Sequence, residues 1–82
     1  MIDLRYSLVI EATSEPDFFS FYSPDLGGFS RVGHSVEDCL YQANWGMADH
    51  VRLLEGQGLP VPLPNPRPRI VVENAPTVRQ AG

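Results

Sequence analysis

The side chains that could carry out chemistry are few, and their spacing keeps them apart. His34, Cys39 and His50 are the only nitrogen and sulfur candidates for a metal site. On a helix, Cys39 and His50 would be separated by roughly 16 Å of rise, so they could not share one ion. Cys39 lies among apolar residues, where a thiol is unreactive. The sequence therefore predicts no metal site and no nucleophilic catalysis.

The acidic residues do not form a predicted catalytic pair. Hydrolases that use carboxylates need at least two of them at a defined separation. Glu37 and Asp38 are adjacent and would point in different directions on a helix, and Asp25 is typical of a turn. Gly27-Gly28 lacks the Gly-Lys-Ser/Thr of a phosphate-binding loop. We therefore predict that the chain is not an enzyme, has no catalytic residues and binds no cofactor.

Length and charge favour one small domain that works by contact. The chain has 82 residues, with six basic and ten acidic side chains and a net charge of −4. Its arginines are dispersed singly, so direct DNA binding by this chain alone is not expected. The single cysteine fits a cytoplasmic protein, and we expect neither a membrane span nor a secretory signal. Because so small a core buries little surface, we expect self-association as a dimer or tetramer.

Four short segments are predicted to be strands. Residues 4–12 alternate apolar and polar side chains, which is typical of a half-buried strand. Residues 18–23 are rich in aromatic side chains and suggest a hairpin with the first strand. Residues 29–32 are a weaker candidate, whereas residues 69–73 are dense in β-branched residues. Residues 74–82 are expected to form a flexible tail.

A long helix is predicted to follow Ser35. Serine is a good N-cap, and acidic residues in the next turn favour a helix start. Gly56 and Gly58 are expected to end the helix. Its apolar face consists of Val36, Leu40, Ala43, Met47, Val51 and Leu54. Together the elements predict an α+β domain over residues 1–73, in the order β-β-β-α-β, with a small antiparallel sheet and the helix on one face.

A second stripe runs beside the apolar face of the predicted helix. Its members are Tyr41, Trp45, Ala48 and Arg52. The stripe is either the edge of a wide core-facing surface or a docking surface for another subunit. Tyrosine, tryptophan and arginine are enriched in protein interfaces. We therefore predict protein contacts through Tyr41, Trp45 and Arg52, together with Phe19 and Phe21 of the second strand.

The segment between the helix and the last strand has proline at every second position. This pattern runs from Pro60 to Pro68 and favours an extended conformation. The even spacing never places two prolines three residues apart, as SH3-type ligands do. We therefore expect a stiff connector that returns the chain along the helix to the last strand.

The stretch from Tyr6 to Glu73 resembles the HicB-like antitoxin family. The first matching motifs are Tyr6–Glu11 as the first strand and Phe21–Gly28, which contains Pro-Asp-Leu-Gly-Gly. Gly33-His34-Ser35 and Glu37–Leu40 follow at the helix start, and Gly58-Leu59-Pro60 comes after the helix. The resemblance implies a partial ribonuclease-H-like fold without its catalytic acids. It also implies oligomers that neutralise a small basic, HicA-like toxin that cleaves mRNA.

The resemblance also shapes the expected mechanism. Typical members continue into a DNA-binding domain, whereas only a short stretch follows Glu73, so no direct DNA binding is expected. The antitoxin-like protein would cover the active surface of its partner, and its negative charge would steer a basic toxin toward it. Two alternatives remain: an orphan oligomeric adaptor or regulatory protein without a toxin, and a degenerate hydrolase, which rests on fold analogy alone.

Overall fold

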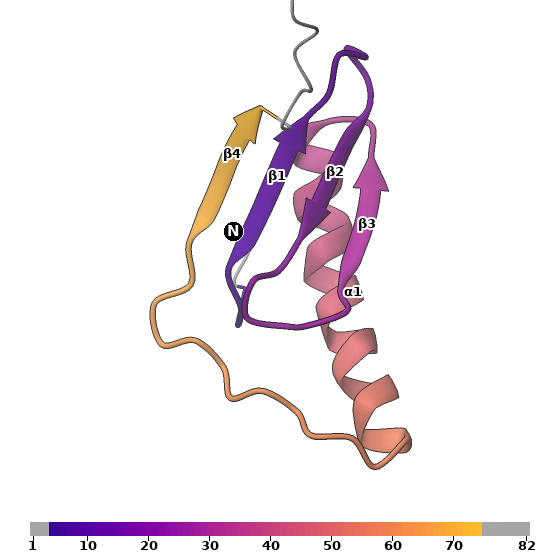
Figure 1. The fold of residues 1–82 in the computed structure, drawn as a ribbon, viewed down its shortest axis with the longest axis vertical. Coiled ribbons are helices and arrows are strands. Elements are labelled where there is room, and N and C mark those ends of the chain that lie inside the picture. Colours follow the sequence, from indigo (N-terminus) through magenta and orange to yellow (C-terminus); the bar gives the residue numbers. More distant parts are fainter. Residues whose placement is uncertain (1–3, 75–82) are drawn as a thin grey trace, which may run out of the picture.

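The fold has one helix and one four-stranded sheet. In the computed structural model, which describes residues 4–74, the elements are β1 (Leu8–Ala12), β2 (Phe19–Tyr22), β3 (Ser30–Gly33), α1 (Val36–Gly56) and β4 (Ile70–Asn74). Figure 1 shows the strands side by side with α1 behind them. The α+β class and the β-β-β-α-β order are thus confirmed. The first strand begins at Leu8 and is therefore shorter than the predicted residues 4–12.

The strand order across the sheet is β3-β2-β1-β4. The pairs β1–β2 and β2–β3 are antiparallel, whereas β4 runs parallel to β1, with Leu8 opposite Ile70. The sheet is therefore mixed, which corrects the purely antiparallel sheet expected from the sequence. The reason is the crossover: α1 and the connector carry the chain back to the end of the sheet where β1 begins.

The core lies between the sheet and α1. Leu8, Ile10 and Phe21 point from the strands toward the helix and are fully buried. Cys39, Ala43 and Met47 meet them from α1. The predicted apolar face of the helix is confirmed, because its other four members pack against this core. Most of the helix contacts go to β1, β2 and β3.

Side-chain and backbone hydrogen bonds define both ends of α1. The hydroxyl of Ser35 accepts a bond of 3.0 Å from the backbone N–H of Asp38, so the predicted N-cap is confirmed. The carboxylate of Asp38 in turn accepts from the backbone N–H of His34 at 2.9 Å. At the far end, the N–H of Leu59 donates to the carbonyl of Leu54 at 2.9 Å. Gly58 takes the left-handed conformation that this ending requires, with φ of 70°.

A glycine within α1 allows the helix to approach the β3 side of the sheet. A Cβ atom at Gly46 would lie 3.0 Å from Cε1 of Phe29 and 3.1 Å from Cζ of Arg31. Such distances are too short for an ordinary carbon–carbon contact. The glycine is unfavourable for the helix itself, and it is explained by this close approach.

The proline-rich connector, residues 59–68, contains neither helix nor strand and is held by hydrogen bonds at several points. The hydroxyl of Tyr6 donates to the carbonyl of Pro62 at 2.7 Å. The N–H of Asn65 donates to the carbonyl of Arg5 at 2.8 Å. Figure 1 shows the connector sweeping from the end of α1 to β4. Of the predicted tail, Asn74 belongs to β4, and residues 75–82 lie outside the described residues.

Candidate binding surfaces

The face of the sheet opposite α1 is open. Because Leu8 and Ile10 point toward the helix, their neighbours on β1 point to the other side. In Figure 1, α1 lies on only one side of the sheet. We call the other side the open face; the strand register places on it Val9, Glu11, Ser20, Tyr22, Ser30, Val32, Val71 and Glu73. None of these side chains is fully buried.

The open face has an apolar row beside an acidic pair. Val71 lies opposite Val9, which lies opposite Tyr22. In the next row, Glu11 and Glu73 are in register on adjacent parallel strands. Adjacent strands are about 4.8 Å apart, so the two carboxylates repel each other. A cationic side chain from a partner would relieve this repulsion while apolar contacts formed beside it.

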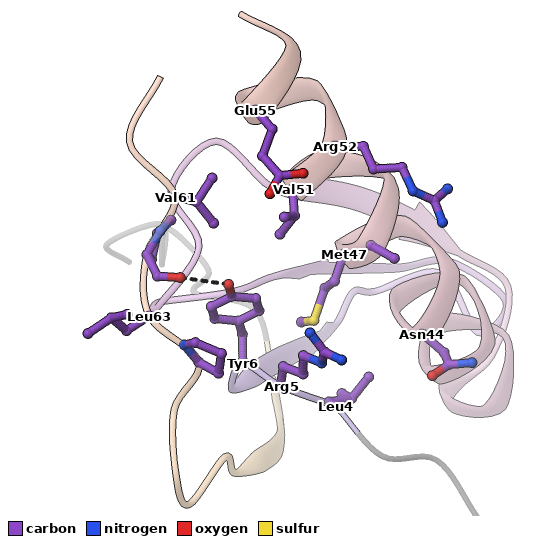
Figure 2. A pocket seen from close by; sticks show the side chains of 13 residues that line it. Leu4, Arg5, Tyr6, Asn44, Met47, Val51, Arg52, Glu55, Val61 and Leu63 are labelled. Carbon is purple, nitrogen blue, oxygen red and sulfur yellow. Dashed lines mark hydrogen bonds between the residues drawn. The ribbon is translucent and has the colours of Figure 1, made fainter. Parts of the chain in front are cut away.

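A cleft of about 750 Å³ lies between the second half of α1, residues 4–6 and the connector. Figure 2 shows Arg5 reaching into this cleft near Met47, and Tyr6 bonded to the connector. Most of the other lining side chains are apolar: Leu4, Val51, Val61, Pro62, Leu63 and Pro64. Among the described residues that line the cleft, Glu55 is the one carboxylate, so these residues offer no carboxylate pair for acid–base catalysis.

Asp25 connects three segments of the chain. Its carboxylate accepts hydrogen bonds from the side-chain amide of Asn65 at 2.9 Å and from the backbone N–H of Ser7 at 2.8 Å. These bonds favour the ionised form and lower the pKa of Asp25. The hydroxyl of Ser7 also accepts from the backbone N–H of Arg69 at 2.9 Å. Asp25 therefore ties the turn after β2 to the chain before β1 and to the connector.

The candidate metal ligands do not converge. Cys39 is buried in the core, and burial, with the nearby Asp38 carboxylate, raises the pKa of its thiol. A ring nitrogen of His50 lies 3.0 Å from the carbonyl of Gly27 and is hydrogen-bonded to it. His34 is exposed before α1. Within residues 4–74, no three His, Cys, Asp or Glu side chains gather where they could hold an ion.

The residues predicted to make protein contacts fall into two groups. Phe21 is 0% exposed and Phe19 packs against the core, so Phe21 has no surface to offer a partner, which corrects its predicted role. Tyr41 and Trp45 are 63% and 61% exposed. Arg52 is also exposed, and its guanidinium lies 3.3 Å from the carboxylate of Asp49. The second stripe is therefore not the edge of the core, and its role in docking stays a prediction.

Sequence reasoning missed the importance of β4 as a surface. The three consecutive apolar residues Ile70, Val71 and Val72 predict a strand, but they do not by themselves indicate which sides of that strand are covered. All five residues of β4 are exposed. The signal was present, because an uninterrupted apolar run in a strand needs cover on both faces.

No helix within residues 4–74 is both long and apolar enough to cross a membrane. Comparisons of the chain with protein-family models, with curated proteins and with solved structures found no match. The resemblance to HicB-like antitoxins therefore rests on the short motifs between Tyr6 and Glu73 alone.

Proposed function

We propose that this chain is an antitoxin-like binding protein that neutralises a small basic, HicA-like toxin by covering its active surface. The observation that carries the proposal is the open face, where two carboxylates in register lie beside an apolar row. The chain's net charge of −4 acts in the same direction, because opposite potentials accelerate encounter and disfavour wrong partners.

The chemistry of the open face fits inhibition by coverage. A basic RNA-cleaving protein must present cationic side chains to the phosphates of its substrate. Glu11 and Glu73 can bind such cationic groups, and Tyr22 with Val71 supplies apolar contact area that excludes water around them. No reaction by the antitoxin itself is required, so the proposal keeps the prediction that the chain is not an enzyme. A cytoplasmic location, where an mRNA-cleaving partner would act, stays a prediction.

A second candidate function is an oligomeric adaptor or regulatory protein without a toxin. The outer edge of β4, which pairs with no strand within residues 4–74, is able to pair with another chain and favours this alternative. Under it, self-association would occur but no small basic protein would bind.

We expect a small basic protein to be encoded next to this chain in its own genome, and the deciding experiment uses that protein. We expect the two proteins to bind tightly in calorimetry and the ribonuclease activity of the basic protein to be inhibited. Glu11→Lys should weaken binding about tenfold or more, because it places like charge against the partner. Glu55→Lys makes the same charge change on α1, away from the open face, and should leave the affinity within about twofold.

Equal losses of affinity in Glu11→Lys and Glu55→Lys, or no binding by the basic protein, would contradict the proposal. A ribonuclease assay of this chain alone provides a further check. We expect no activity, and activity that disappears in Asp25→Asn would show that the chain is an enzyme.

A further inference from the structure

β4 is an edge strand, and no described residue protects its outer side. It pairs with β1, and within residues 4–74 no strand lies on its other side. Ile70, Val71 and Val72 are 47%, 39% and 52% exposed, although they point alternately to the two faces of the sheet. Proteins usually protect such an edge with prolines, lysines, bulges or a covering helix. None of these occurs within β4, whose contacts with α1 are minor.

The backbone of β4 has hydrogen-bonding groups directed outward. The N–H of Leu8 donates to the carbonyl of Arg69 at 2.8 Å, and Leu8 lies opposite Ile70. In a parallel ladder this pattern directs the peptide groups of Arg69 and Val71 toward β1. The N–H and carbonyl groups of Ile70 and Val72 therefore point away from the sheet, toward whatever lies beside β4.

We propose that a second copy of this chain adds its own β4 to this edge, antiparallel, about a twofold axis through Val71. In this arrangement Ile70 lies opposite Val72 of the second copy, and the two residues exchange backbone hydrogen bonds. Arg69 then lies opposite Glu73 of the second copy on both sides of the axis. The two sheets become one continuous sheet with both helices on the same face.

Charge complementarity within β4 is the argument for a second copy as the occupant. The strand carries arginine just before its apolar run and glutamate just after it, so antiparallel self-pairing brings opposite charges together twice. These pairs occupy non-hydrogen-bonded positions, where facing side chains are closest.

The register is fixed by the neighbouring residues. Moving the second strand by two residues in one direction places Pro68, which has no N–H, opposite Val72. Moving it by two residues in the other direction places Glu73 opposite Val71 and leaves the charges unpaired. A shift of one residue sets outward-pointing peptide groups against inward-pointing ones. The strand is therefore self-complementary in one register.

Packing and charge on the two faces support the same arrangement. Ile70 and Val72 project on the helix side, in register with the buried Leu8 and Ile10, but remain half exposed. Pairing about the axis places Ile70 against Val72 of the second copy, and Val72 against its Ile70. On the open face, the arginine of the second copy would lie beside Glu73 and relieve the acidic pair. In the dimer Glu73 is paired with this arginine, so Glu11 is the carboxylate of the pair that remains for the basic partner proposed above; the inference itself does not depend on that function.

The test measures self-association of the full chain by sedimentation velocity at a series of micromolar concentrations. The unmodified protein should dimerise. Arg69→Glu and Glu73→Arg should each weaken the dimer about tenfold or more, because each replaces two attractive pairs with repulsive ones. An equimolar mixture of these two variants should dimerise as well as the unmodified chain, because every cross-strand pair in the mixed dimer is again attractive.

A proline pair separates dimerisation from folding. Val72→Pro removes an outward-pointing N–H and should give a folded monomer. Val71→Pro removes an N–H directed at β1 and should lower the thermal midpoint as well. A monomeric unmodified chain, a dimer that keeps its affinity in both charge reversals, or a mixture that fails to recover would each overturn the proposal. None of these outcomes involves binding of the basic protein, so the two proposals fail independently.

Discussion

The two edges of the sheet differ in how far the described chain covers them. At β3, the helix approaches closely over Gly46, and the side-chain amide of Gln42 donates to the outer carbonyl of Val32 at 2.9 Å. At β4 no such side chain or helix intervenes within residues 4–74. At β3 the chain itself thus satisfies an outer carbonyl, whereas at β4 no described residue bonds the outward groups of the strand. The dimer proposed above would therefore form at the β4 edge and not at the β3 edge.

The two edges also depend on different kinds of interaction. The β3 side is held by apolar contacts in which Phe29 packs against Phe21 with ring centroids 6.0 Å apart. The β4 side is held by the hydrogen bonds that Tyr6, Ser7 and Asp25 make with the connector or with Arg69. Tight packing is sensitive to side-chain volume, whereas a polar network is sensitive to single donors, acceptors and pH.

The largest effect is expected from Gly46→Ala, at the β3 side. Alanine improves helix propensity by up to about 1 kcal/mol, but its methyl group would press on Phe29 and Arg31. Overpacking of this kind costs about 1–3 kcal/mol, so urea denaturation should show a less stable protein. Gly56→Ala is the matched control, because nothing lies within 4 Å of the added carbon. A more stable Gly46→Ala variant would contradict the close approach.

Tyr6→Phe should loosen the β4 side by a smaller amount. The change removes the hydrogen bond to the carbonyl of Pro62 and costs about 0.5–1.5 kcal/mol. Hydrogen exchange measured by mass spectrometry should become faster for the peptide that contains β4, while the β3 peptide exchanges as before. Equal acceleration at both edges would show that the edges are not held independently.

Gln42→Ala should cost less than about 1 kcal/mol in urea denaturation, because its bonds lie near the surface. The change would, however, free the outer carbonyl of β3. We expect more self-association than in the unmodified chain, measured by light scattering. Asn44→Ala, another amide deletion on the exposed part of α1, should change neither quantity. Unchanged scattering in Gln42→Ala would mean that this side chain does not protect the edge.

The smallest effect is a dependence of stability on pH. Hydrogen bonds from Asn65 and Ser7 hold the pKa of Asp25 below its ordinary value of 3.8. A lowered pKa in the folded state means that the stabilisation is fully present above about pH 4 and is lost as the pH falls through the folded-state value. The pKa of Asp38 is lowered as well, chiefly by the backbone N–H of His34. Both edges should therefore weaken in acid.

Asp25→Asn separates the contributions of Asp25 and Asp38 to the change of stability with pH. In thermal melts between neutral pH and about pH 3, this variant should lose less stability than the unmodified chain, because one of the two groups no longer titrates. The part of the slope due to Asp38 should remain. An unchanged slope would mean that the carboxylate of Asp25 contributes nothing in the folded state.

Local features of the sequence predict the helix well, and features that depend on distant pairing were predicted poorly. The serine cap and the apolar face of α1 depend on residues within a few positions of one another, so Ser35 and Met47 were placed correctly. Phe21 was misassigned because alternation in an aromatic segment does not tell which face is buried. The parallel pairing of β4 with β1 depends on how α1 and the connector direct the chain, which no local pattern encodes.

The same limit applies to the candidate surfaces. The helical positions of Tyr41 and Trp45 beside the apolar face left two alternatives, the edge of the core or a docking surface, and only the structure shows that both side chains are exposed. The acidic pair on the open face did not, because Glu11 and Glu73 become neighbours only when the last strand joins the first. The polar network around Asp25 likewise joins Ser7 and Asn65 from opposite ends of the described chain. The strand order, and not the adjacent residues in the sequence, thus decides which side chains lie next to a charged residue.

The parallel pairing of β1 with β4 has a consequence for biosynthesis. β4 is translated last among the described elements, and Ser7 and Arg69, which bond where the two strands begin, are 62 positions apart. A long loop must close before β1 gains its second neighbour, which slows that step. Until β4 has emerged from the ribosome, β1 offers an unfilled slot to a strand from any nearby nascent copy. Chains growing side by side on one message would therefore meet while this slot is still open.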